Sequence, residues 1–508
     1  MSNEDFFITI IKPFEINHVL FKRFLKSFKY FIMNQNTLWS LRLGFSNKEA
    51  SKIAKKGLKS FLEDSYKTPF DSSIPAFLDG SPKSFEDLKE ARQKLKSSNP
   101  EAAKVMRKEE AQTSLEMKMW WINQMATAEF PLREKMTCFW HNHYVSTFQK
   151  VKINYWIFQH NQILREHAFG NFKTLTKEII KSNAMVRYLD NVDNRKGKLN
   201  ENLSRELLEL FTLGIGNYTE EDIKNGAKGL AGLGFGENNA VYKEKQQDNE
   251  SFVYLGKKGN FKIDEMIDII FEQPNIPYLV TRKILKWYIY DNPKEELVKY
   301  YGDYFKKKNF EIKPLLTKMF TEEFAKNTAG TKIKNPLEYI LQLNNELNIQ
   351  NPNTRLIVNF IKDQGMDLFN QPNVKGWDGG NAWLTSQVFL QRNNIADSLC
   401  NGRNLVRAKK ESEQNAMMDQ NQMMNQNATV NQNQYRQIHV HLDWNKDGTN
   451  KDIIAELENR LLFQTDAADQ QDFEKLLKYD FDSKTEGSEN AVMRLFNFMV
   501  KTPEFQLI

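Results

Sequence analysis

Apolar residues in this chain recur at intervals of three and four residues, the spacing of one face of an α-helix. Between residues 46 and 63, for example, they include Ile53, Leu58 and Phe61. Glycine and proline, which interrupt helices, number only 23 and 14 among 508 residues. Their usual shares are higher, at about 7% and 5%. The sequence therefore predicts an all-α protein, with a large multi-helix domain and few short strands.

Helical spacing continues along most of the chain. The predicted helices cover 46–63, 84–98, 101–128, 132–144, 154–167, 172–188, 201–213, 219–230, 264–272, 279–290, 294–307, 312–320, 335–348 and 352–363, with two or three more in 451–508. β-Branched and aromatic residues predict short strands at 252–255 and 437–442.

Changes in composition divide the chain into four parts. Residues 1–32 form an N-terminal extension, and Met33 is an alternative start. The main helical domain spans 33–402. Residues 403–437 are rich in Asn, Gln and Met, so they bury too little apolar surface to offset their ordering entropy and are predicted to be a disordered insertion. A short strand and C-terminal helices fill 438–508.

Charge and cysteine content exclude several classes of protein. The net charge of +6 is small for this length, so dedicated nucleic-acid binding is not expected. Cys138 and Cys400 lie far apart, which excludes a disulfide framework and a cysteine-based zinc site. No apolar run is long enough for a transmembrane helix. Because no export signal is recognisable, we expect a cytoplasmic protein, with export as the alternative if the N-terminus is misread.

Five ordered blocks of sequence share a pattern with one known family. They read MTCFWHNHY (136–144), REHAFGNF (165–172), AMVRYLDN (184–191), NENLSRELLELFTLG (200–214) and PNVKGWDGG (372–380). Together they resemble the bacterial domain-of-unknown-function family 1800 (DUF1800), with matches from about Leu38 to Arg403. The resemblance implies a helical fold but no reaction. Because many relatives are encoded beside a protein resembling the alkaline phosphatase and sulfatase fold, it also implies a partner of that kind.

The block at 200–214 predicts a helix with one charged side. Glu201, Arg205 and Glu209 fall on one arc at 100° per residue, with Glu206 beside them. One hypothesis is that this side is buried, with Arg205 between Glu201 and Glu209, and meets His141, His143 or Asp190. The alternative is a solvated face with weak ion pairs.

These blocks supply the candidate site residues. The candidate catalytic residues are His141, His143, Glu206 and Glu209, and the candidate binding residues are Asp190, Glu201, Arg205, Trp377 and Arg392. An HExxH metal motif is absent, no cofactor is predicted, and the ligand spacing gives no support for a divalent metal. The tight turn around Trp377 either exposes this side chain to a ligand or buries it as an anchor.

Two other motifs are weaker. Asp443–Gly448 matches the first half of a calcium loop, but position 12 is Ile454 instead of Glu, so a polar turn is predicted. Gly232–Gly236 lacks the Lys-Ser/Thr of a phosphate-binding loop and is predicted to be a flexible connection.

Two functions fit these observations. The first is a helical accessory or binding protein with a central His/Glu/Arg cluster, acting with a protein partner that is phosphatase- or sulfatase-like. The alternative is a metal-assisted or acid/base hydrolytic enzyme that uses the same cluster. Convergence of the histidines and carboxylates in one solvent-connected pocket would favour the enzyme. Arg205 paired with both Glu201 and Glu209, together with histidines bonded to backbone groups, would favour the binding protein.

Overall fold

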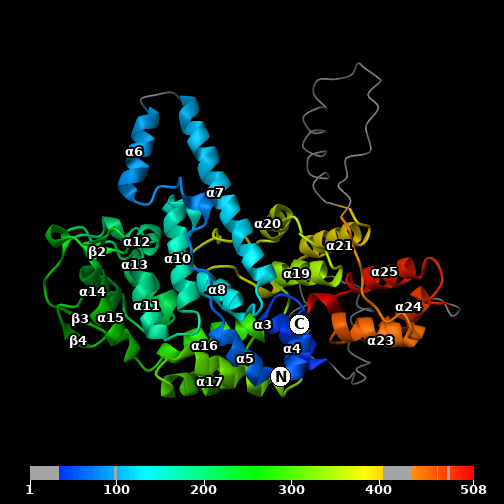
Figure 1. Ribbon diagram of the computed structural model, residues 1–508. Helices are drawn as coiled ribbons and strands as arrows, with labels where there is room; N and C mark the ends of the chain where they lie inside the picture. Colours follow the sequence, from blue (N-terminus) through cyan, green and yellow to red (C-terminus); the bar gives the residue numbers. More distant parts are fainter. Residues whose placement is uncertain (1–33, 97–99, 404–437, 466, 478–480) are drawn as a thin grey trace. The chain divides into compact units, whose positions relative to one another are not determined.

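The computed structural model describes residues 34–96, 100–403, 438–465, 467–477 and 481–508 (Figure 1). Helices dominate these residues, and the only strands among them form two small sheets, which confirms the predicted all-α fold. The predicted extension at 1–32, and the predicted insertion from 404 to 437, lie outside the described residues.

The chain groups into two compact units. One consists of 52–327 and 361–378. We call it the motif unit because all five family-like blocks begin in it. The second unit consists, within the described residues, of 34–51, 328–360 and positions from 379 onward. Residues 438–508 therefore share a unit with 328–360.

The motif unit is built almost entirely from helices. They are α5 (Leu58–Lys67), η1 (Ala76–Leu78), α6 (Phe85–Lys96), α7 (Pro100–Thr127), α8 (Leu132–His143), α9 (Phe148–Val151), α10 (Asn154–Glu166), α11 (Phe172–Ile180), α12 (Asn183–Tyr188), η2 (Asn191–Asp193), α13 (Asn202–Glu206), η3 (Leu207–Thr212), α14 (Glu220–Leu230), η4 (Glu244–Gln246), α15 (Ile263–Phe271), α16 (Ile276–Tyr288), α17 (Glu295–Lys307) and α18 (Ile312–Phe324).

The second unit contains α3 (Gln35–Leu43), α19 (Pro336–Glu346), α20 (Thr354–Asp363, whose last three residues belong to the motif unit), η5 (Gly380–Trp383), α21 (Ser386–Cys400), α23 (Asn450–Leu461), α24 (Ala467–Leu476), α25 (Ser488–Met499) and η6 (Glu504–Gln506). Helix α4 (Ala50–Lys56) begins there and ends in the motif unit. No helix in the described parts of the chain is both long and apolar enough to cross a bilayer.

The two sheets are antiparallel pairs. β1 (Leu233–Gly234) pairs with β2 (Val241–Tyr242), and β3 (Phe252–Tyr254) pairs with β4 (Lys257–Gly259). The strand predicted at 252–255 is therefore confirmed. The strand predicted at 437–442 is wrong for its described part, 438–442, which forms no strand ladder.

Two of the long predicted helices are each two helices. The predicted 46–63 helix divides into α4 and α5 at Gly57, which has φ of +77° and so cannot continue a right-handed helix. The predicted 172–188 helix divides into α11 and α12 at Ser182, whose side chain accepts from the Met185 amide as an N-cap. Periodicity alone misses both breaks because the apolar face continues across them.

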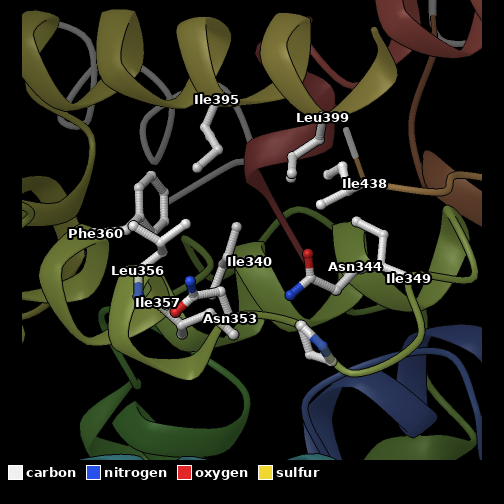
Figure 2. Close-up of a pocket in the computed structure, with 11 residues that line it drawn as sticks. Ile340, Asn344, Ile349, Asn353, Leu356, Ile357, Phe360, Ile395, Leu399 and Ile438 are labelled. Atoms are coloured by element: carbon white, nitrogen blue, oxygen red, sulfur yellow. Dashed lines mark hydrogen bonds between the residues drawn. The ribbon is translucent and has the colours of Figure 1, made fainter. Parts of the chain in front are cut away.

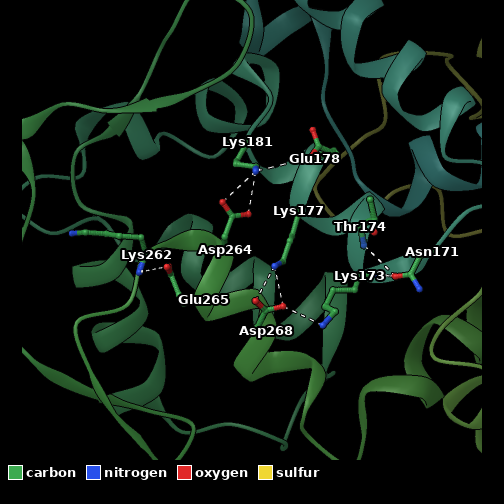
Figure 3. Close-up of polar contacts among 10 residues, drawn as sticks. All are labelled: Asn171, Lys173, Thr174, Lys177, Glu178, Lys181, Lys262, Asp264, Glu265 and Asp268. Atoms are coloured by element: carbon green, nitrogen blue, oxygen red, sulfur yellow. Dashed lines mark hydrogen bonds and ion pairs between the residues drawn. The ribbon is translucent and has the colours of Figure 1, made fainter.

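The core of the motif unit is rich in aromatic rings. α8 packs against α10 and contributes Trp140, whose ring stacks on that of Phe172 from α11. On the outside, three ion pairs join α11 and the residue after it to α15: Lys173 and Lys177 pair with Asp268 at 3.1 and 2.9 Å, and Lys181 pairs with Asp264 at 3.0 Å (Figure 3). These charged groups are largely exposed, so each pair contributes little to stability. The aromatic core fixes the end of α8, where the candidate histidines lie.

Candidate functional site

The charged block at 200–214 forms two kinds of helix. α13 is an α-helix, and η3, which follows it directly, is a π-helix. The amide of Leu213 donates to the carbonyl of Leu208, five residues earlier. Such widened turns are rare and often occur at functional sites. This widened turn places the carbonyl oxygens of Leu210 and Phe211 where side chains from other helices donate to them.

His143, the last residue of α8, is bonded on both ring nitrogens. Nε2 lies 3.0 Å from the Phe211 carbonyl oxygen, and Nδ1 lies 3.2 Å from Nζ of Lys283 on α16. A carbonyl oxygen only accepts, so Nε2 carries the proton, and Nδ1 accepts from the lysine. Lys283 also donates to the Leu210 carbonyl at 2.9 Å. His143 and Lys283 together hold the end of η3.

His143 is neutral in the folded protein. Burial lowers its pKa well below the usual value, and the nearby positive charge of Lys283 lowers it further. His141 is also buried, and burial followed by its neighbour His160 lowers its pKa. Its Nε2 donates to the Ser146 carbonyl at 3.2 Å, and Nδ1 has no partner among the described residues. Both histidines therefore donate to backbone carbonyls.

The predicted convergence of the histidines with the carboxylates is wrong. Neither His141 nor His143 bonds Glu206 or Glu209 in the described structure, because each ring points into the aromatic core and binds a carbonyl there. Residues two apart on a helix face different directions, so the two histidines also bind different elements. Sequence spacing gave no sign of the carbonyls, which a π-turn and a loop supply.

Glu206 and Glu209 lie on the other side of the helix. Glu206 is half-buried, and its pKa is raised by burial and by the charge of Glu209, with Arg205 and Lys375 acting in the opposite direction. Glu209 accepts a hydrogen bond from the Tyr218 hydroxyl at 2.8 Å. The two carboxylates are thus close enough to influence one another, as the sequence suggested, but without a histidine.

Arg205 is at the surface, and the predicted buried pairing with Glu209 is wrong. Its side chain is 36% exposed, and it donates to Glu220 at 2.9 and 3.0 Å and to Glu201 at 3.3 Å. Glu220 is the first residue of α14, and the chain turns back after η3 to place it there. The charged side of this helix is therefore a solvated face with ion pairs, as the alternative hypothesis expected.

Asp190 is on the surface beside these groups. It has a left-handed φ of +55°, and its carboxylate pairs with Lys150 at 2.7 Å. Tyr188, two residues earlier, has its pKa raised to about 12 by burial and then by the charge of Glu206. The partner of the Asp190 carboxylate is therefore a lysine, and not one of the candidate catalytic residues.

Trp377 is buried as an anchor, at 5% exposure. Its amide donates to the side-chain oxygen of Asn142, the residue between the two histidines, at 2.7 Å. Gly376 has φ of +87° and lies so close to Asn142 that a Cβ would be 2.6 Å from the Asn142 carbonyl oxygen. The blocks at 136–144 and 372–380 are thus in direct contact through Asn142, Gly376 and Trp377.

Arg392 belongs to the second unit and not to the cluster. It is fully buried on α21, where it donates to the Gln506 side chain and to the Lys334 carbonyl, both at 3.0 Å. Its guanidinium lies over the ring of Tyr339, and burial lowers its pKa to about 10. These contacts are those of a structural anchor for the last helices.

The second unit also contains an apolar pocket (Figure 2). α19, α20 and α21 line it with aliphatic side chains and Phe360, and Asn344 and Asn353 are its polar groups. None of the predicted site residues lies in it. No group of three or more His, Cys, Asp and Glu side chains suited to a metal ion occurs in the described parts of either unit.

One exposed residue in the loop after η3 was missed from the sequence. Ile215 follows η3 and is 77% exposed. Asn217 fixes the loop around it by donating to the carbonyls of Leu213 and Gly214. Gly214, with φ of +85°, makes the turn possible. An isolated isoleucine between glycines carries no periodic signal, so only the structure shows that it is presented to solvent.

Comparison with known proteins places the chain in one family. Residues 37–507 match the family described as "Protein of unknown function (DUF1800)", a longer stretch than the five motif blocks cover. No curated protein and no solved structure matches the chain. Because the match covers most of its length, the chain belongs to the DUF1800 family.

Proposed function

We propose that this protein is a binding protein that acts through a protein partner, and that the partner docks on the surface beside η3. This surface, which we call the acidic face, consists of Glu206, Glu209, Ile215 and Tyr218. The loop after η3 joins Ile215 to Tyr218, and the Tyr218 hydroxyl bond joins that loop to Glu209.

The observation that carries the proposal is that both candidate histidines bond backbone carbonyls instead of the carboxylates. His141 and His143 donate to backbone carbonyls and have strongly lowered pKa values, so they are poorly placed to act as bases for Glu206 and Glu209. The carboxylates keep part of their surface exposed. Groups of this kind are available to an external partner.

Ile215 supplies the apolar part of the contact. An aliphatic side chain 77% exposed on a fixed loop can be buried by a partner without ordering new backbone. Carboxylates around such an anchor select a partner with basic groups around an apolar depression. The family resemblance suggests a phosphatase- or sulfatase-like protein as that partner.

Site-specific photo-crosslinking tests this proposal in the cells that produce the protein. A benzoylphenylalanine placed at position 215 should form one discrete crosslinked product, and Glu206→Lys with Glu209→Lys should abolish it. Val253, 48% exposed on β3, is the matched control position. A product that also forms from position 253, or that survives both charge reversals, would count against the acidic face.

The alternative is a hydrolytic enzyme that works by metal-assisted or acid/base chemistry. One observation favours it, since burial and the charge of Glu209 raise the pKa of Glu206 and so favour the protonated form that a proton donor needs. Under this alternative, Glu206→Gln would abolish hydrolysis of phosphate and carboxylate esters by the purified protein. Hydrolysis that is absent, or unchanged by the substitution, favours the binding protein.

We also propose a cytoplasmic location. The cysteines at 138 and 400 are both free and buried, which suits a reducing compartment. Cell fractionation that finds a trimmed chain outside the cytoplasm would support the alternative of export.

A further inference from the structure

Lys283 lies in an unusual position for a lysine. It is half-buried on α16, and Nζ donates to His143 Nδ1 at 3.2 Å and to the Leu210 carbonyl at 2.9 Å. Both partners are uncharged. Its amine is therefore held in a fixed place, at the end of the π-helix, without a compensating negative charge.

The basic residues next to Lys283 on α16 have different partners and charges around them. Arg282 pairs with Glu295, whereas within the described ranges no carboxylate forms an ion pair with Lys283. Lys286, almost one turn further along α16, adds a like charge, and its Nζ donates to the Asp378 carbonyl at 3.3 Å. The groups around the amine thus disfavour its protonated form.

The consequence is a basic group that loses its proton near neutral pH. Burial, and then the charge of Lys286, lower the pKa of Lys283 to about 8. At pH 7.5 about a quarter of Lys283 is then the neutral amine, compared with about 0.1% for a lysine at its usual pKa of about 10.4. Desolvation beside another cation is a recognised way to make a lysine nucleophilic.

We infer that Lys283 is a reactive amine that captures small carbonyl compounds as a Schiff base, with His143 Nδ1 and the Leu210 carbonyl holding the amine in place. The lone pair of Nζ attacks the carbonyl carbon, a C–N bond forms, and the C=O π electrons move to oxygen. One N–H proton passes to the alkoxide oxygen, which gives a carbinolamine, and the second N–H proton then passes to the hydroxyl group. Water then leaves, and the imine remains.

The surroundings limit which carbonyl compounds fit. Only part of the Lys283 side chain is exposed, so the inference is restricted to small carbonyl compounds. The exposed charge of Lys286 favours a compound that carries a carboxylate near its carbonyl group. The substrate class is therefore small aldehydes and 2-oxo acids. This capture is independent of the partner surface proposed above.

Reductive trapping of the whole protein tests the inference. The protein is incubated with glyoxylate and cyanoborohydride at pH 7.5, and labelled peptides are measured by mass spectrometry. Lys286, more exposed and on the same helix, is the internal control. Lys283 should be labelled at least about ten-fold faster, since its larger neutral fraction outweighs its lower intrinsic nucleophilicity and access.

The pH profile and one variant complete the test. Labelling of Lys283 should rise with a midpoint near pH 8, well below that of Lys286. Lys283→Arg keeps the charge and the donors but should lose this label alone. Since labelling of the wild-type protein decides the question, a misfolded variant leaves the test intact. Labelling of Lys283 no faster than Lys286, or with the same pH profile, would overturn the inference.

Discussion

Glu134 accepts two hydrogen bonds from the Arg165 guanidinium, at 2.8 and 2.9 Å, in the interior of the motif unit. The side chains are only 8% and 2% exposed, and the indole nitrogen of Trp121 donates to the same carboxylate at 2.8 Å. This pair is therefore a buried ionic contact of the motif unit, whereas Arg205, for which burial was one of two hypotheses, is at the surface.

Arg165→Ala should be far more damaging than Arg205→Ala. Removing Arg165 leaves the Glu134 charge buried and without its ion-pair partner, which costs about 3–5 kcal/mol of unfolding free energy. Arg205 holds only exposed partners, so its loss should cost about 1 kcal/mol or less. Urea denaturation of both variants measures the difference. Similar losses of unfolding free energy for the two variants would show that the buried Arg165–Glu134 pair stabilises the protein no more than the exposed Arg205 pairs do.

The motif unit should lose stability as pH falls from 7 to 5. Burial lowers the pKa of His160 to about 4, below the value of about 6.5 expected in the unfolded chain. Its contribution is thus complete above pH 6.5 and is lost as pH falls further. Over this range the wild-type protein should lose about 2 kcal/mol more than His160→Gln, which keeps a donor for the Tyr144 carbonyl. Equal losses would mean that His160 becomes protonated without unfolding.

Gly376→Ala should be more destabilising than Gly365→Ala. Both glycines have positive φ, at +87° and +81°, so both variants suffer the same backbone strain of about 1–2 kcal/mol. Only at Gly376 would the new Cβ collide with Asn142, which should add about 1–3 kcal/mol. Thermal denaturation of the two variants isolates this contact. Matching melting temperatures would show that the loop moves away from Asn142 at little cost.

Most of the helices follow from the sequence, whereas the arrangement of the site does not. Periodicity locates α8 and α14, and α14 begins with a capping box formed by Thr219 and Asp222. Periodicity cannot locate the π-turn in η3, because widening a helix by one residue leaves the apolar pattern nearly unchanged. For the same reason it cannot show that His143 binds the Phe211 carbonyl.

The exposure of Arg205 could not be predicted from the sequence either. Its helix pattern allowed either Glu201 or Glu209 as a partner, and the partner actually closest, Glu220, is 15 residues away on the next helix. Which face is buried depends on where the chain returns after η3, and that depends on the loop containing Gly214 and Asn217. Long-range contacts of this kind have no signature in one sequence.

Titration calorimetry with the protein captured at position 215 tests the proposed function most directly. The purified partner is titrated into the wild-type chain, Ile215→Asp, and the control Val253→Asp. We predict a dissociation constant at least about ten-fold higher for Ile215→Asp, corresponding to about 1.4 kcal/mol, and no change for Val253→Asp. Wild-type affinity for Ile215→Asp would contradict the assignment of the acidic face as the partner-binding surface.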